Sequence, residues 1–360
     1  MATQRPALFL DPATPQRWPV FQTPYEAEAL DFCRAWVSGQ SEFVLQTSGS
    51  TGVPKAITLT RAQMRASAHL TGQTLGLKPG DAALVCLNVR YVAGVMMLVR
   101  GLELSLPMTI IEPSGNPLAN FDPRKIRFAF MAFVPLQLQT VLEQASDKLP
   151  ILNGMKAILV GGAATSPALE QALQVIESPV FATYGMTETL SHIALRRLNG
   201  TERRDWFTAL DGVDLGTDER GCLHITSVAT NFVRVQTNDV VELSDPTHFR
   251  LLGRADRIIN SGGVKVQPEQ IEQIIENVLA TAGVRGRLFV AGLPSERLGQ
   301  RVVLFCEAWT PTDEQWQRIQ DAVRTQMGPY AVPKKAITVA QFSETPTGKM
   351  DRVRTIDQYR

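Results

Sequence analysis

Residues 47–55 read TSGSTGVPK, a run of hydroxyls and glycines that ends in a lysine, formed by Thr47, Ser48, Gly49, Ser50, Thr51, Gly52, Val53, Pro54 and Lys55. Glycines let backbone N–H groups approach phosphate oxygens, hydroxyls donate further hydrogen bonds, and the lysine supplies positive charge. The run is therefore predicted to bind phosphate, although it lacks the Gly-x-x-x-x-Gly-Lys-Ser/Thr spacing of a Walker A loop. A flexible surface loop is the alternative.

The residues around this loop predict alternating strands and helices. Phe43-Val44-Leu45 is a short apolar run before the loop, and Thr60 with Gln63 forms a capping box that predicts a helix after Thr60. Two more buried strands, 157–160 and 180–183, are predicted from continuous apolar residues. Each runs into a tight turn, which is where α/β folds usually place ligands.

The turns after these two strands contain residues that suit a nucleotide. Gly161, Gly162 and Ala163 predict either the edge of a nucleotide site or a plain turn between a strand and a helix. The second turn reads YGMTET from Tyr184 and Gly185 onward. The Tyr184 ring can lie on a purine face, and Glu188 can ligate Mg²⁺ that phosphate oxygens also hold. Alternatively, Thr187 and Glu188 cap a following helix.

Four charged residues farther along the chain could complete such a site. Asp239 follows a β-type stretch and can accept hydrogen bonds from both hydroxyls of a ribose, with a turn-capping role as the alternative. Arg254 can also reach the ribose, and Asp256 can act as a pivot; a salt-bridged surface linker is the alternative. Lys349 lies on a Pro/Gly turn near the C-terminus, where composition alone predicts a solvated side chain.

The apolar pattern restarts beyond Gly253, which predicts a second domain. A helix is expected from Pro268, because apolar residues recur at 271, 274, 275, 278 and 279. Further strands are expected at 287–290, 302–309 and 336–340, and a second helix at 313–327. We therefore expect an α/β protein with a large domain, 1–253, that has a nucleotide site at strand ends, and a small, mobile α+β domain, 254–360.

Composition excludes several classes of protein. The chain has 360 residues, with 36 Lys and Arg against 35 Asp and Glu, so no bulk charge favours nucleic acid or an anionic membrane. The four cysteines form no CxxC pair, which suits a reducing compartment. We see no secretion signal and no apolar run of the ~20 residues that cross a bilayer. A cytoplasmic protein with small-molecule substrates is expected, and a homo-oligomer is left open.

Taken in this order, the segments resemble the adenylate-forming superfamily of acyl-CoA synthetases, nonribosomal adenylation domains and luciferases. The resemblance runs from about Phe43 to the end of the chain. It is carried by residues 47–55, 184–189, 253–256 with 261–266 and 268–272, and 346–349. It implies a reaction in two steps, in which a carboxylate and ATP give an acyl-adenylate and pyrophosphate, and the thiol of CoA then displaces AMP.

The resemblance also implies roles for individual residues. Lys349, Glu188 and Thr187 would be catalytic, with Glu188 holding Mg²⁺. Asp256 would be the hinge about which the small domain rotates between the two steps, and Gly262 and Gly263 would approach CoA. The nucleotide would be bound by Thr47, Ser48, Gly49, Ser50, Thr51, Gly52, Lys55, Gly161, Gly162, Ala163, Tyr184, Gly185, Asp239 and Arg254.

Within the superfamily, residues 93–101 and 184–196 resemble the o-succinylbenzoate–CoA ligases of menaquinone synthesis. This acid is a dicarboxylate, so its spare benzoate needs a cation or several donors, for which Arg90, His192 and Arg196 are candidates. A ligase for another aryl or acyl acid, or an adenylation module that loads a carrier protein, is the alternative. The chain departs from many relatives in its short N-terminal portion and in Asn238, where a glycine is common. Arg90-Tyr91 also stands where many relatives have a histidine.

Overall fold

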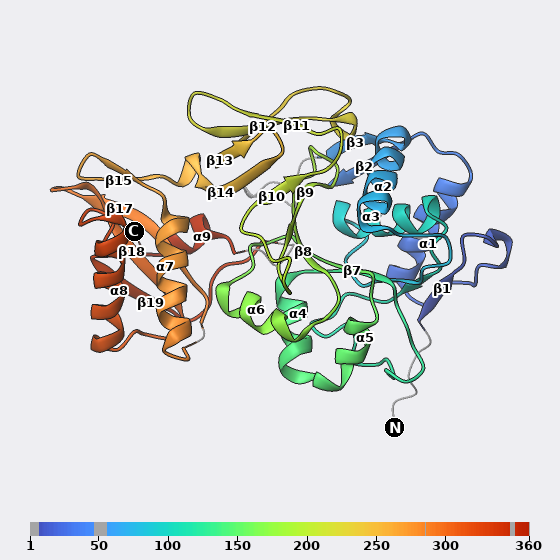
Figure 1. Ribbon diagram of the computed structural model, residues 1–360, viewed down its shortest axis with the longest axis horizontal. Coiled ribbons are helices and arrows are strands. Elements are labelled where there is room, and N and C mark those ends of the chain that lie inside the picture. The colour runs from blue at the N-terminus through green and yellow to red at the C-terminus, as the bar shows by residue number, and fades with distance from the viewer. Residues whose placement is uncertain (1–6, 47–55, 285, 346–349, 360) are drawn as a thin grey trace.

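The computed structural model describes residues 7–46, 56–284, 286–345 and 350–359, and these residues form three sheets. The largest sheet has 12 strands, a second sheet of five strands lies in the C-terminal part, and a two-stranded ribbon lies near the N-terminus. Figure 1 shows the C-terminal sheet, in orange and red, with its helices beside the large sheet. The predicted fold class is confirmed.

One half of the large sheet is parallel. The order is β1-β5-β4-β6-β7-β8. Strands β5, β4, β6, β7 and β8 are parallel to one another, and β1 pairs antiparallel with β5. Ala83, Leu84 and Val85 are fully buried, as expected of a parallel strand that is covered on both faces. The bounds are β1 (Leu8–Leu10), β4 (Ala83–Val85), β5 (Met108–Ile110), β6 (Phe130–Phe133), β7 (Ala157–Val160) and β8 (Val180–Gly185).

The order in which the chain adds strands to the sheet reverses between β4 and β6. The chain passes from β4 to β5 on one side and returns to β6 on the other side of β4. Ligands of α/β proteins bind outside the carboxyl ends of the strands near such a point. The intervening helices are α3 (Val92–Glu103), α4 (Pro135–Gln144), η2 (Ser146–Lys148), α5 (Leu149–Asn153), α6 (Pro167–Ala172) and η3 (Leu173–Val175).

The other half of the large sheet is antiparallel, in the order β9-β10-β14-β13-β12-β11 beyond β8. The strand β9 pairs directly with β8, so the turn after Tyr184 leads into a strand. The alternative in which Thr187 and Glu188 cap a helix is therefore wrong. The bounds are β9 (His192–Arg197), β10 (Phe207–Ala209), β11 (Asp214–Thr217), β12 (Cys222–Thr226), η4 (Val228–Thr230), β13 (Val235–Asp245) and β14 (His248–Arg254).

The two-stranded ribbon pairs the strand before the TSGSTGVPK run with the strand after it. Strand β2 (Glu42–Gln46) pairs antiparallel with β3 (Ala56–Thr60), so a strand lies between the run and the helix that begins after Thr60. The capping box of Thr60 and Gln63 is present at the start of α2 (Arg61–Leu75), as predicted. Before the ribbon come η1 (Pro15–Arg17) and α1 (Pro24–Val37), whose Trp36 stacks on Phe43 of β2.

The C-terminal sheet has the order β16-β15-β18-β17, with β19 parallel to β18. The large sheet ends at Arg254 and this sheet begins at Ile259, with η5 (Ala255–Arg257) between them. Helix α7 also contacts α6 and β14 of the large part. The bounds are β15 (Ile259–Ser261), β16 (Val264–Val266), α7 (Pro268–Thr281), β17 (Leu288–Ser295), β18 (Gly299–Glu307), α8 (Asp313–Met327), β19 (Lys335–Val339) and α9 (Arg352–Ile356).

All four cysteines are buried and free, and burial raises the pKa of each of their thiols. In the part of the chain that the structure describes, no helix has the length and apolar character needed to span a membrane.

Candidate active site

Glycines at the carboxyl ends of β7 and β8 let two loops lie close to the neighbouring backbone and side chains. A Cβ atom on Gly161 would lie 2.1 Å from Thr183 Oγ1, and one on Gly185 would lie 2.2 Å from the carbonyl oxygen of Ser191. Gly162 has a φ of +87°, which favours glycine. The loop from Gly161 to Ala163 is at least partly exposed, so its backbone lies open at this edge of the sheet.

Four of the residues expected from the sequence form one connected network. The Tyr184 hydroxyl donates to Asp239 Oδ2 at 2.6 Å, and Arg254 Nη1 donates to Asp239 Oδ1 at 3.2 Å. The same guanidinium binds Asp256 through two hydrogen bonds, of 2.9 Å and 2.7 Å. The structure therefore links the proposed ribose carboxylate to the proposed hinge carboxylate through a single arginine.

The electrostatics of this network follow from its pairing. Burial, with the nearby charge of Asp239, raises the pKa of Tyr184, so its hydroxyl stays a donor. Hydrogen bonds from Arg254 lower the pKa of Asp256, which is therefore ionised at neutral pH. Two carboxylates around one guanidinium leave a net negative charge. Asp239 can still accept from a sugar hydroxyl, because a carboxylate has about four lone-pair sites.

The Tyr184 ring belongs to an aromatic cluster. It lies edge-on to Phe249 with ring centroids 5.0 Å apart, and 5.8 Å from Phe207. Only 8% of the residue is exposed. The network and this cluster together fix the ring, and stacking of a purine on it stays a prediction.

Thr187 and Glu188 lie in the turn between β8 and β9. Thr189 Oγ1 accepts from the backbone N–H of Met186 at 2.9 Å and is fully buried, so it pins the turn. Glu188 is exposed, whereas Thr187 is buried. The described residues contain no cluster of three or more His, Cys, Asp or Glu side chains that could hold a metal. One exposed carboxylate is nevertheless compatible with Mg²⁺, which is commonly bound by one or two carboxylates together with substrate phosphates.

Several expected site residues fall outside the described residues, namely Thr47, Ser48, Gly49, Ser50, Thr51, Gly52, Lys55 and Lys349. The described residues on either side show where the two segments, 47–55 and 346–349, begin and end. Gln46 pairs with Ala56 in the ribbon, and Glu344 forms an antiparallel bridge with Met350. The two glycines expected to approach CoA, Gly262 and Gly263, form the exposed turn between β15 and β16, with φ of +59° and +83°.

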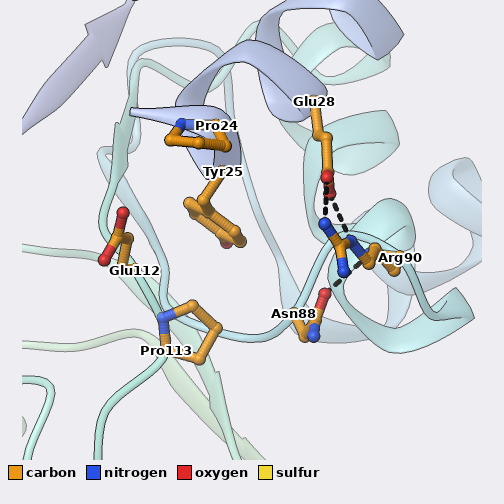
Figure 2. Close-up of a pocket in the computed structure, with 7 residues that line it drawn as sticks. All are labelled: Pro24, Tyr25, Glu28, Asn88, Arg90, Glu112 and Pro113. Carbon is orange, nitrogen blue, oxygen red and sulfur yellow. Dashed lines mark hydrogen bonds and ion pairs between the residues drawn. The ribbon is translucent and has the colours of Figure 1, made fainter. Parts of the chain in front are cut away.

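The three candidates for the spare carboxylate have different partners. Arg90 Nε donates to Glu28 at 2.7 Å at the rim of a cleft of about 340 Å³, which Tyr25 and Glu112 also line (Figure 2). Arg196 is paired with the buried Glu170 of α6 at 2.6 Å. His192 is buried, and its pKa is lowered by burial and by a neighbouring guanidinium, so its imidazole is neutral. The structure does not show these three side chains in contact with one another.

The guanidinium beside His192 belongs to Arg100, which we did not select from the sequence. Arg100 is 3% exposed, and its Nη2 donates to Ser191 Oγ at 2.6 Å and its Nε to Thr71 Oγ1 at 3.2 Å. His192 Nδ1 lies 3.4 Å from Nη2. No carboxylate of the described residues pairs with it, and burial lowers the pKa of Arg100 to about 9. The sequence signal that could have identified this residue was the position of an arginine within the apolar helix at 92–103.

Comparison with known proteins places this site in a family. A model of AMP-binding enzymes matches residues 24–209, and a model of the AMP-binding enzyme C-terminal domain matches residues 274–349. The chain is 26% identical to a 2-succinylbenzoate–CoA ligase of Listeria monocytogenes serotype 4b, over 92% of this chain and 72% of the relative. It is 25% identical to another from Bacillus cereus, over 91% and 73%.

Solved structures give the same picture. An acyl-CoA synthetase (AMP-forming)/AMP-acid ligase II-like protein of Dyadobacter fermentans is 43% identical, with a TM-score of 0.66, and the match covers 98% of this chain and 99% of that one. That protein is therefore similarly short. An o-succinylbenzoate coenzyme A synthetase of Bacillus subtilis, solved with ATP and magnesium, has a TM-score of 0.67 at 19% identity and covers 87% and 69%. This second match supports the fold alone.

The resemblance noted from the sequence is thus confirmed independently by family models and by relatives that span most of the chain. Because the AMP-binding model alone matches more than half of its residues, the chain belongs to the AMP-binding enzyme family.

Proposed function

We propose that this protein is an ATP-dependent acid–CoA ligase, which converts a carboxylic acid into an acyl-adenylate and then into a CoA thioester. We further propose that its acid is o-succinylbenzoate. The names of the Listeria and Bacillus relatives support this choice, and each match spans about nine-tenths of this chain.

The observation that carries the substrate class is the buried Arg100. A buried cation without a carboxylate partner costs folding free energy, because the protein must hold a charge away from water. A substrate that brings its own carboxylate would supply the missing partner. o-Succinylbenzoate has two carboxylates and only one is activated, so the other is free to bind Arg100, whose guanidinium donates to Ser191 and Thr71 in the ligand-free protein. We therefore favour Arg100 over the surface-paired Arg90 as its counter-charge.

The nucleotide is assigned to the network at the strand ends. Asp239 and Arg254 would bind the ribose hydroxyls, and the backbone of the loop from Gly161 to Ala163 would line the base. Glu188 would hold Mg²⁺ together with phosphate oxygens, and the bound ion would neutralise charge on the pyrophosphate leaving group. The phosphates would lie against the run at 47–55, in keeping with its hydroxyls and Lys55.

Lys349 would stabilise charge at the pentacoordinate phosphorus in the first step. No protein nucleophile is needed, since the substrate carboxylate attacks the α-phosphorus and the thiol of CoA later attacks the acyl carbon. The two steps need different surroundings, so we propose that 254–360 rotates against 1–253 about Asp256, which brings the turn of Gly262 and Gly263 toward CoA.

Turnover with a panel of acids tests this proposal. AMP and CoA-thioester formation would be measured with ATP, Mg²⁺, CoA and o-succinylbenzoate, benzoate or medium-chain fatty acids. A strong preference for o-succinylbenzoate is the expected result. Turnover only with monocarboxylic acids would reject the substrate and the role of Arg100 but keep the reaction class. Acid-dependent ATP–pyrophosphate exchange without consumption of CoA would instead indicate a module that loads a carrier protein.

A further inference from the structure

The hydrogen bonds around the buried His192 fix which of its ring nitrogens carries the proton. The Thr71 hydroxyl donates its only hydrogen to the carbonyl oxygen of Ser67, at 2.9 Å. Thr71 Oγ1 can therefore only accept from its other two neighbours, Arg100 Nε and His192 Nε2, each 3.2 Å away. Because His192 Nε2 must be the donor in this pair, it is the protonated nitrogen.

The other ring nitrogen of His192 is an acceptor. Burial and the charge of Arg100 lower the pKa of His192, so the ring is neutral and Nδ1 carries a lone pair. This Nδ1 atom lies 3.4 Å from Arg100 Nη2 and 3.5 Å from Ser191 Oγ, and both of these groups can donate to it. His192 therefore has no free N–H group for a substrate carboxylate, and its acceptor faces the guanidinium.

These contacts hold one edge of the Arg100 guanidinium and leave its third nitrogen nearly unused. Nε donates to Thr71, while Nη2 donates to Ser191 at 2.6 Å and faces His192. Among the described residues, Nη1 has only the thioether sulfur of Met97, at 4.0 Å. A thioether is a weak acceptor, so the N–H groups of Nη1 are available to a carboxylate.

A neutral imidazole suits this place better than a charged group would. A guanidinium is planar and donates in fixed directions, so the acceptors on one edge decide where its remaining N–H groups point. His192 provides an acceptor without adding negative charge. A carboxylate in its place would pair with Arg100 and compete with the substrate.

We infer that His192 is a positioning residue for Arg100, and that through Arg100 it determines the preference for acids with a second carboxylate. The inference rests on the proposed function, in which Arg100 binds the carboxylate that is not activated. A histidine with a merely structural role would affect all acids equally when it is replaced.

Two acids that differ by a single group test this role. β-Benzoylpropionate is o-succinylbenzoate without its ring carboxylate, and the preference is the ratio of the two kcat/KM values, measured by pyrophosphate release. Inactive protein cancels in this ratio, so the ratio can be measured in a variant of lower stability. His192→Leu removes both ring nitrogens, His192→Gln keeps polar atoms only near the position of Nε2, and His192→Asn restores an acceptor near Nδ1.

We expect His192→Leu and His192→Gln to lower the preference for o-succinylbenzoate about tenfold, through a higher KM for this acid alone and with the KM for ATP unchanged. His192→Asn should retain most of the preference. Arg100→Met should abolish it, and adding His192→Leu to that variant should cause no further loss, because the histidine acts through the arginine.

Three outcomes would overturn the inference: an unchanged preference in both His192→Leu and His192→Gln, a loss in His192→Asn as large as in His192→Leu, or equal losses with both acids. In each case an Arg100→Met variant without the preference would still support the proposed function. If Arg100→Met left the preference intact, the assignment of Arg100 in the proposed function would fail, and the role of His192 with it.

Discussion

Replacing Arg100 with methionine should stabilise the ligand-free protein while it weakens acid binding. The side chain is fully buried on α3, and hydroxyls and a neutral imidazole surround its charge. Methionine has an unbranched chain of similar length that can fill the same space without a charge. The substitution therefore separates the free-energy cost of burying this guanidinium from its contribution to binding of the acid.

The size of the effect follows from the burial of the charge. Burial lowers the Arg100 pKa from 12.5 to about 9. At about 1.4 kcal/mol per pH unit, this drop corresponds to about 5 kcal/mol of unfavourable free energy in the ligand-free state. Methionine loses the hydrogen bonds to Ser191 and Thr71, so we expect a net gain of about 1–3 kcal/mol. Loss of a charge-assisted bond to the acid should raise its dissociation constant about 10- to 100-fold.

Urea unfolding at pH 7.5, with and without o-succinylbenzoate, measures both quantities. We expect the variant to unfold at a higher urea concentration than the parent. We also expect o-succinylbenzoate to raise the unfolding free energy of the variant less than that of the parent. Arg196→Met is the matched control, since it leaves the buried Glu170 without its shortest ion pair and should destabilise the protein. A destabilised Arg100→Met protein that binds the acid as tightly as the parent would refute the reasoning.

Three further predictions concern other sites. Asp239→Asn should raise the KM for ATP about tenfold or more in pyrophosphate exchange, because a charged acceptor is lost; an unchanged KM would remove Asp239 from the ribose site. Burial and the charge of Glu272 raise the pKa of Glu276 from 4.5 to about 7, so the folded protein loses stability as the pH rises through this interval. Glu276→Gln should then raise the unfolding free energy at pH 8 by at most about 3 kcal/mol and have a smaller effect at pH 5; equal effects at both pH values would contradict this assignment. Arg90→Ala should change the KM for o-succinylbenzoate less than about threefold, since Arg90 is exposed and paired with Glu28; a large increase would restore Arg90 as the counter-charge.

The amino-acid sequence by itself determined the local elements. The capping box of Thr60 and Gln63, the apolar strand at 157–160 and the amphipathic helix from Pro268 form as expected. Each depends on residues within one or two turns or one strand, and neighbouring side chains and backbone groups set those preferences. The order of the motifs was also enough to indicate the family.

Only the tertiary structure decided which polar side chains meet. Tyr184 and Asp239 are 55 residues apart in sequence, and Arg100 and Ser191 are 91 apart. The sequence offered several arginines for one carboxylate. The apolar helix around Arg100 is a local sign of burial, but only the fold shows that Arg90 is paired at the surface and that Arg100 is buried without a carboxylate partner among the described residues. The cost of a buried charge depends on the water and countercharges around it, and chain segments distant in sequence supply or exclude these.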